Sequence, residues 1–112
     1  MATWAKTELA EKALIYLGVK AAGQSVSAED DDLIQSVIDS VYAQARTYGI
    51  APFQLAAIPE WAQWPLAKWV AVEAGPAFGK LLPFTIRDDA QNDLRRQMQG
   101  DKPAMPMKAK YY

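Results

Sequence analysis

Acidic side chains are the first place in this sequence where residue type and spacing suggest chemistry. The densest group is four consecutive acids, from Glu29 to Asp32. A calcium or magnesium site needs oxygen ligands that converge, as in calcium loops with a glycine at a fixed position. Consecutive acids at the start of a helix point in different directions. We therefore interpret them as the acidic first turn of a helix, stabilised by the helix dipole, with Ser27 as its N-cap.

A pair of carboxylates, Glu60 and Glu73, is a second chemical possibility, as acid and base in glycoside hydrolysis. Nothing in the sequence brings them together across a cleft. The chain has no histidine and no cysteine, which excludes an imidazole base, a thiol nucleophile and a Cys/His zinc site. A carboxylate-only Mg²⁺ or Ca²⁺ site is still formally open. We expect no enzyme activity, no metal and no cofactor.

Basic side chains are a third possibility, because they could contact phosphate. Arg87, Arg95 and Arg96 are interleaved with acids, which is typical of a solvated helix face. The net charge is −1 and the pI is about 5.3, whereas a free-standing nucleic-acid-binding domain usually has a basic surface. A small helical DNA-binding or regulatory module is therefore the alternative reading, and no helix offers it a one-sided basic face.

The elements that position these residues are helices. The chain has 112 residues, of which 51% are hydrophobic, enough for one compact domain with a core. Apolar spacing and Gly, Pro and Ser signals predict an all-α bundle of about four helices, over residues 4–17, 27–49, 59–79 and 85–100. We expect this domain to fill residues 1–100 and an extended tail to fill residues 101–112. No signal peptide or membrane-spanning run is present, so the expected location is cytosolic.

Excess apolar surface is the strongest functional signal. The third helix is apolar all round and contains three tryptophans, more than a small core easily holds, so we expect some of them at an interface. Pro65 either kinks this helix or marks its true start. The loop over residues 50–58 is apolar and either tucks under the domain or docks on a neighbour. The candidate interface residues are Ile15, Phe53, Leu55, Trp61, Trp64 and Trp69.

The tail differs from the rest of the chain, because two prolines forbid a stable helix there and lysines make it basic. Methionine and tyrosine side chains add apolar surface. We expect the tail to dock on its own domain or on a neighbour. The candidate docking residues are Lys102, Pro103, Met105, Pro106, Met107, Lys108, Lys110, Tyr111 and Tyr112.

Three groups of short motifs carry a resemblance over roughly residues 5–98. The first is Leu-Gly-Val at 17–19 with Ser-Ala-Glu-Asp at 27–30, and the second is Tyr-Gly-Ile at 48–50. The third is Ile-Pro-Glu-Trp at 58–61, an alanine-rich helix, Phe-Gly at 78–79 and Leu-Arg-Arg at 94–96. In this order the motifs resemble the head–tail adaptor (head-completion, tail accessory factor) proteins of tailed bacteriophages.

The resemblance implies a helical structural protein that assembles as a ring, commonly of twelve copies, beneath the portal protein. Such a ring extends the DNA channel, helps to retain packaged DNA without sequence-specific binding, and attaches tail nozzle or tail fibre components. It implies a virion location at the head–tail neck, with assembly in the bacterial host cytoplasm and no membrane contact. It also implies that the tail over residues 101–112 docks on the portal.

Overall fold

The computed structural model describes residues 3–21 and 23–100, and these residues form an all-α domain of four α-helices and one 3₁₀ turn. The elements are α1 (Lys6–Leu17), α2 (Ala28–Thr47), α3 (Glu60–Ala74), η1 (Gly75–Phe78) and α4 (Phe84–Gly100). The predicted fold class is confirmed. The docking residues predicted for the tail, from Lys102 to Tyr112, lie outside the described residues.

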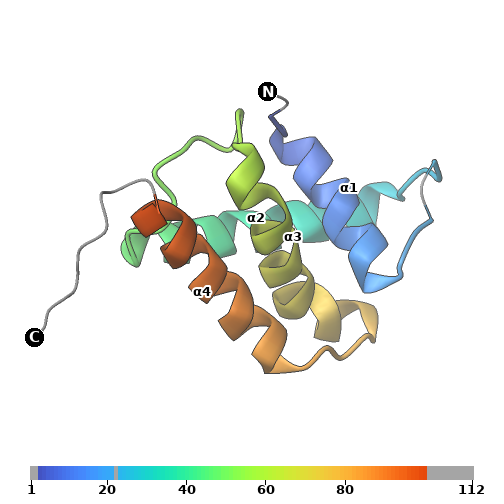
Figure 1. Ribbon diagram of the computed structural model, residues 1–112. Helices are drawn as coiled ribbons and strands as arrows, with labels where there is room; N and C mark the ends of the chain where they lie inside the picture. Colours follow the sequence, from blue (N-terminus) through green and yellow to red (C-terminus); the bar gives the residue numbers. More distant parts are fainter. Residues whose placement is uncertain (1–2, 22, 101–112) are drawn as a thin grey trace, which may run out of the picture.

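Helix α3 lies in the middle of the domain, with α1 and α2 packed on one side and α4 along the other (Figure 1). Nine of its residues are buried, among them Leu66, Trp69 and Val70. Helix α4 covers α3 with one face, on which Ala90 and Leu94 are buried. The all-round apolar pattern of the third helix therefore has its cause in enclosure by three neighbouring helices.

The helix ends follow the local signals in the sequence. The Ser27 side chain accepts a hydrogen bond from the backbone N–H of Asp30 at 3.2 Å, which satisfies one of the free donors at the start of α2. Gly18 ends α1 with φ at 86°, a conformation that glycine adopts without a steric penalty. These two residues fix the direction in which the chain passes from α1 to α2.

The first helix begins at Lys6 rather than at Trp4. The Glu8 carboxylate accepts a hydrogen bond from the Ala5 backbone N–H at 3.1 Å, which places the N-cap at Ala5. Trp4 instead forms an isolated antiparallel bridge with Ile58, with N···O distances of 3.0 and 2.7 Å. This bridge joins the start of the chain to the start of α3.

Two prolines have different effects in the third segment. Helix α3 continues through Pro65, so the interpretation that Pro65 marks its start is wrong. The helix ends at Ala74 and tightens into η1, which contains Pro76 and closes at Gly79 with φ at 71°. A Cβ at Gly75 would lie 2.1 Å from the backbone oxygen of Lys80, so the returning chain requires glycine at this position.

We predict that Ser27→Ala lowers the free energy of unfolding by about 1 kcal/mol, because the Asp30 N–H loses its partner at the start of α2. Urea denaturation measures the change. Ser36→Ala, at an exposed position inside the same helix, is the matched control and should be neutral or slightly stabilising. Equal losses for the two variants would contradict the capping role.

Candidate interaction surfaces

The most exposed large hydrophobic side chains among the described residues are Leu81 and Phe84, at 83% and 67% exposure. We call them the Leu81/Phe84 patch. The residue before them, Lys80, donates its backbone N–H to the Gly75 carbonyl at 2.9 Å, and so the chain returns against η1 just before the patch. The Arg87 guanidinium lies 5.0 Å from the centre of the Phe84 ring, within the range of a cation–π contact. Large, strongly exposed apolar side chains close together in sequence are candidates for a contact with another protein.

Trp64 forms a second exposed apolar site, near the N-terminal end of α3. Its side chain is 44% exposed, and its ring packs edge-on against Trp4 with centroids 5.5 Å apart. The Lys12 ammonium lies 5.9 Å from the centre of the Trp4 ring on the same cluster. Trp64 is the fifth residue of α3, whereas the Leu81/Phe84 patch comes after the C-terminal end of this helix and η1, so the two sites are separated along the chain by most of α3.

Trp69 was predicted as a candidate interface residue, but the structure buries it in the core. Its side chain has 0% exposure because α3 carries it into the core, and the ring of Tyr48 stacks parallel to it at 6.3 Å. Tyr48 keeps the exposed position, at 51%. Trp69 therefore stabilises the domain and offers no surface to another chain.

The apolar loop over residues 50–58 tucks against the domain, the first of the two alternatives. Phe53 is 8% exposed and packs edge-on against Trp61 at 5.7 Å. The Tyr42 hydroxyl donates a hydrogen bond to the Phe53 carbonyl. Leu55, Trp61 and Ile15 are partly buried. Of the six predicted candidates, Trp64 thus keeps the largest exposed surface.

Leu81 and Phe84 were not among the predicted interface residues. The signal that would have indicated them is the run Leu-Leu-Pro-Phe at 81–84, directly after the Gly79 turn. It is the same kind of apolar loop as residues 50–58. Sequence does not distinguish the two loops, because burial of one and exposure of the other depend on contacts with distant helices.

An acidic groove lies between α1, the 18–27 segment and the first turn of α2. Its volume is about 300 Å³. The floor is apolar and the rim carries three carboxylates, while none of the described residues that line it is basic. The lining residues are Thr7, Glu8, Ala10, Glu11, Leu14, Val26 and Asp31.

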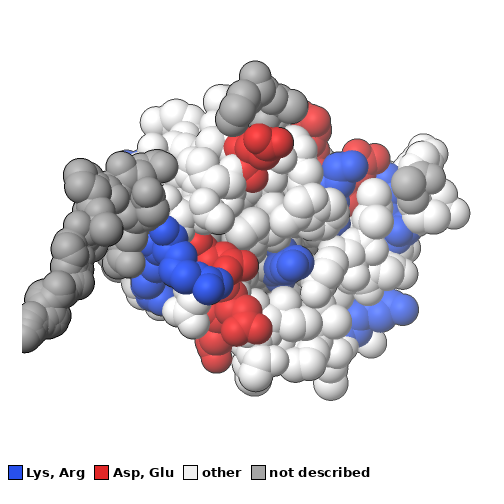
Figure 2. Space-filling model, viewed as in Figure 1, with Lys and Arg blue, Asp and Glu red and all other residues white. Residues whose placement is uncertain are grey.

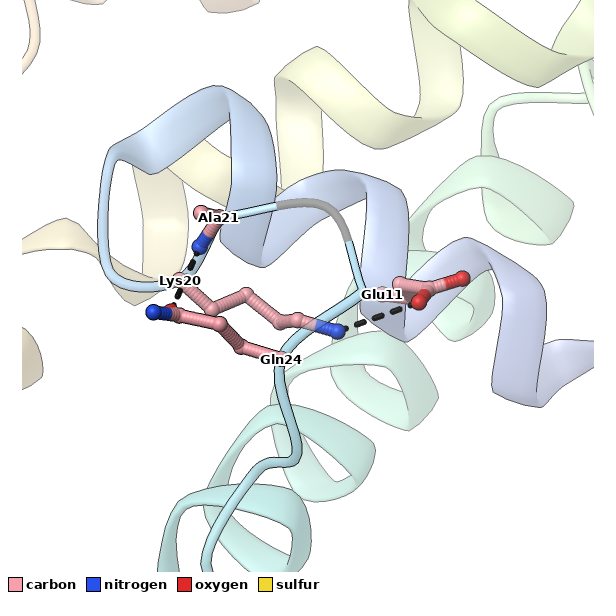
Figure 3. A network of polar contacts seen from close by, with 4 residues as sticks. All are labelled: Glu11, Lys20, Ala21 and Gln24. Atoms are coloured by element: carbon pink, nitrogen blue, oxygen red, sulfur yellow. Dashed lines mark hydrogen bonds and ion pairs between the residues drawn. The ribbon is translucent and has the colours of Figure 1, made fainter.

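One ion pair holds the wall of this groove in place. The Lys20 ammonium lies 3.0 Å from the Glu11 carboxylate, and the Lys20 side chain is only 6% exposed (Figure 3). The Ala21 N–H donates to the Gln24 side-chain oxygen at 2.9 Å in the same segment. The hydrogen bond from Lys20, together with its positive charge, lowers the pKa of Glu11 below its usual value of 4.5.

The basic residues of α4 bond neighbouring polar groups, and Arg87 pairs with both Asp88 on α4 and Glu73 on α3. Arg96 bonds Asp93, and the Arg95 guanidinium lies 3.3 Å from the Asn92 side-chain oxygen. Figure 2 shows basic and acidic side chains next to one another over α4. A groove of about 720 Å³ between α3 and α4 has the same mixed lining, including Lys68 and Asp89. This pattern does not favour the alternative DNA-binding reading.

The residues considered for chemistry lie apart. Glu60 is the first residue of α3 and Glu73 is in its last turn, so roughly 20 Å of helix separates them. Glycosidase carboxylates lie roughly 5–10 Å apart. No three acidic side chains within residues 3–21 and 23–100 come together as a metal-binding group. No helix in the described part of the chain is long and apolar enough to cross a membrane.

Comparison of the chain with protein-family models, with curated proteins and with solved structures finds no match in any of the three.

We predict that Glu11→Gln destabilises the domain at pH 7 and that this difference shrinks in acid. The folded-state pKa of Glu11 is lowered, so its stabilising effect is full well above pH 4.5 and is lost as the pH falls through the lowered pKa. Urea denaturation at several pH values measures the difference between the two proteins.

The control for this prediction removes the partner. In a Lys20→Met background the Glu11→Gln change should have a much smaller effect on stability, because the largest cause of the lowered pKa of Glu11 is gone and only the weaker effect of Lys12 is left. A wild-type advantage that does not change with pH would contradict the assigned role of this ion pair.

Proposed function

We propose that this protein is a structural subunit of the head–tail connector of a tailed bacteriophage, and that it acts through its surfaces without catalysis, metal or cofactor. The single observation that carries the proposal is the presence of two different exposed apolar sites, separated along the chain by most of α3. These are the Leu81/Phe84 patch and Trp64. The motif resemblance names the kind of assembly.

Two unlike sites on one subunit suit a ring. A contact between identical patches closes as a dimer, whereas a contact between different patches repeats from subunit to subunit and closes as a ring when the rotation allows. Aromatic side chains are enriched in such interfaces and Trp64 and Phe84 are of this type. The proposed assembly is a homo-oligomeric ring, with twelve copies as the expected number.

The proposed partners follow from this place in the virion. The ring binds the portal protein on one side and tail nozzle or tail fibre components on the other. Packaged DNA passes through its lumen without sequence-specific contacts. The proposed location is the neck of the virion, after assembly in the cytoplasm of the bacterial host.

We predict that Leu81→Ser with Phe84→Ser weakens subunit association at least tenfold, because both side chains lose most of the apolar surface that they would bury in a contact. Analytical ultracentrifugation measures association. Leu33→Ser is the control, since Leu33 is an exposed leucine on α2, at 37%. The folded domain should keep its stability, since the two replaced side chains are largely exposed.

If the double variant associates as strongly as wild type, the Leu81/Phe84 patch is not part of the interface. The location itself is tested by imaging virions that carry the wild-type chain. A ring of this protein directly below the portal is the expected result. Its absence from the neck would overturn the proposed function.

A further inference from the structure

The acidic groove is an open depression with apolar and acidic lining residues. Ala10, Leu14 and Val26 form an apolar floor. At the rim, the Glu8 carboxylate accepts from the Ala5 N–H and the Asp31 carboxylate accepts from the Gln35 side chain at 3.5 Å. Both donors are neutral, so each carboxylate keeps its negative charge. The helix dipole stabilises both, since they lie in the first turns of α1 and α2, but neither forms an ion pair among the described residues. Lys20 compensates Glu11 only.

Residues 101–112 of this chain have the complementary composition. They contain Lys102, Lys108 and Lys110 against one acid, Asp101. Two methionines and two tyrosines supply apolar side chains for the floor of the groove. Two prolines within the segment exclude a regular helix and suit an extended segment lying along a groove.

The positions of the acidic groove and of the end of α4 indicate which copy of the chain supplies residues 101–112. Helix α4, which precedes it, packs on α3, and α3 separates α4 from α1. The end of α4 lies at the opposite side of the domain from α1 and the 18–27 segment (Figure 1). Twelve residues span at most about 40 Å, and a path to the groove of the same copy would have to run around the domain. A neighbour can place its groove directly beside the end of α4.

We propose that residues 101–112 of one copy bind in the acidic groove of the next copy. The lysines face Glu8 and Asp31, and the methionine and tyrosine side chains lie on the apolar floor. Donor segment and acceptor groove are different parts of the chain, so the contact repeats head to tail. The inference rests on the proposed ring and adds a directional connection between its subunits, separate from the Leu81/Phe84 patch.

A peptide with the sequence of residues 101–112 tests the groove directly. The target is the full chain with its own tail inactivated by Lys102→Glu, Lys108→Glu and Lys110→Glu, which we call the tail variant. The labelled peptide should bind the tail variant, and Glu8→Lys with Asp31→Lys in the same chain should weaken binding at least tenfold. Binding should also weaken when salt is raised from 0.05 to 0.5 M, because salt screens the charge pairs.

Asp88→Lys with Asp89→Lys in the tail variant is the matched control, since it changes the net charge equally on the exposed face of α4. It should leave peptide binding within twofold. No binding to the tail variant, or equal losses for the groove and control changes, would overturn the proposal. The tail variant itself alters no residue of the described domain, so its folding is secure.

Mixing two defective chains tests whether the contact is between copies. The groove variant, Glu8→Lys with Asp31→Lys, has an intact tail, and the tail variant has an intact groove. Each should associate at least tenfold more weakly than wild type. An equimolar mixture should form a one-to-one complex in native mass spectrometry, because one tail still meets one groove.

A mixture that stays monomeric, while the peptide binds, would show that the tail occupies the groove of its own copy and would overturn the proposal. Peptide binding to a portal protein in place of the groove would do the same. A ring in virion images together with either result would leave the proposed function standing and remove only this connection.

Discussion

A helix that is apolar on nearly every side must be enclosed by its neighbours, and α3 imposes this constraint on the whole chain. Helices α1 and α2 cover one side and α4 covers the other, so Trp69 and Val70 have no exposed surface. Enclosure buries most of α3, and its one exposed large apolar side chain is Trp64, in its N-terminal half. Leu81 and Phe84 come after η1, in the loop and at the first residue of α4, so the chain that leaves the far end of α3 carries the second site.

The charged residues at the surface of the domain fall into two groups, exposed pairs and one pair whose lysine is nearly buried. On α4, Arg96 pairs with Asp93 and Arg87 with Asp88, and Arg87 also reaches Glu73 on α3; such exposed pairs contribute little to stability. Lys20 is different, because its side chain is nearly buried and its ammonium group reaches Glu11. That pair holds the 18–27 segment against α1 and so shapes the acidic groove. Glu8 and Asp31 are then left on the rim with neutral donors, and their negative charge is available to a basic partner.

Local signals in the sequence predict the helices well. Ser27, Gly18 and Gly79 act where their chemistry is expected, because capping depends on residues within one turn. Contacts between distant residues are less predictable. The bridge from Trp4 to Ile58 joins segments far apart in sequence. The 50–58 loop is covered because Tyr42 and Trp61 hold Phe53, whereas in the 81–84 run Leu82 packs against the core and Leu81 and Phe84 stay exposed.

The same limit explains which candidate residues were misplaced. An all-round apolar helix with three tryptophans indicates that some of them are exposed, and the order of residues does not say which. The direction of each side chain depends on where α1, α2 and α4 pack, and this places Trp69 inside and Trp64 at the surface. At Gly75 a buried residue determines the position of exposed ones. Its missing side chain lets the Lys80 backbone approach, and that close return of the chain sets the position from which Leu81 and Phe84 project. The core of the domain therefore determines where these surface residues lie, through a buried glycine a few residues before them.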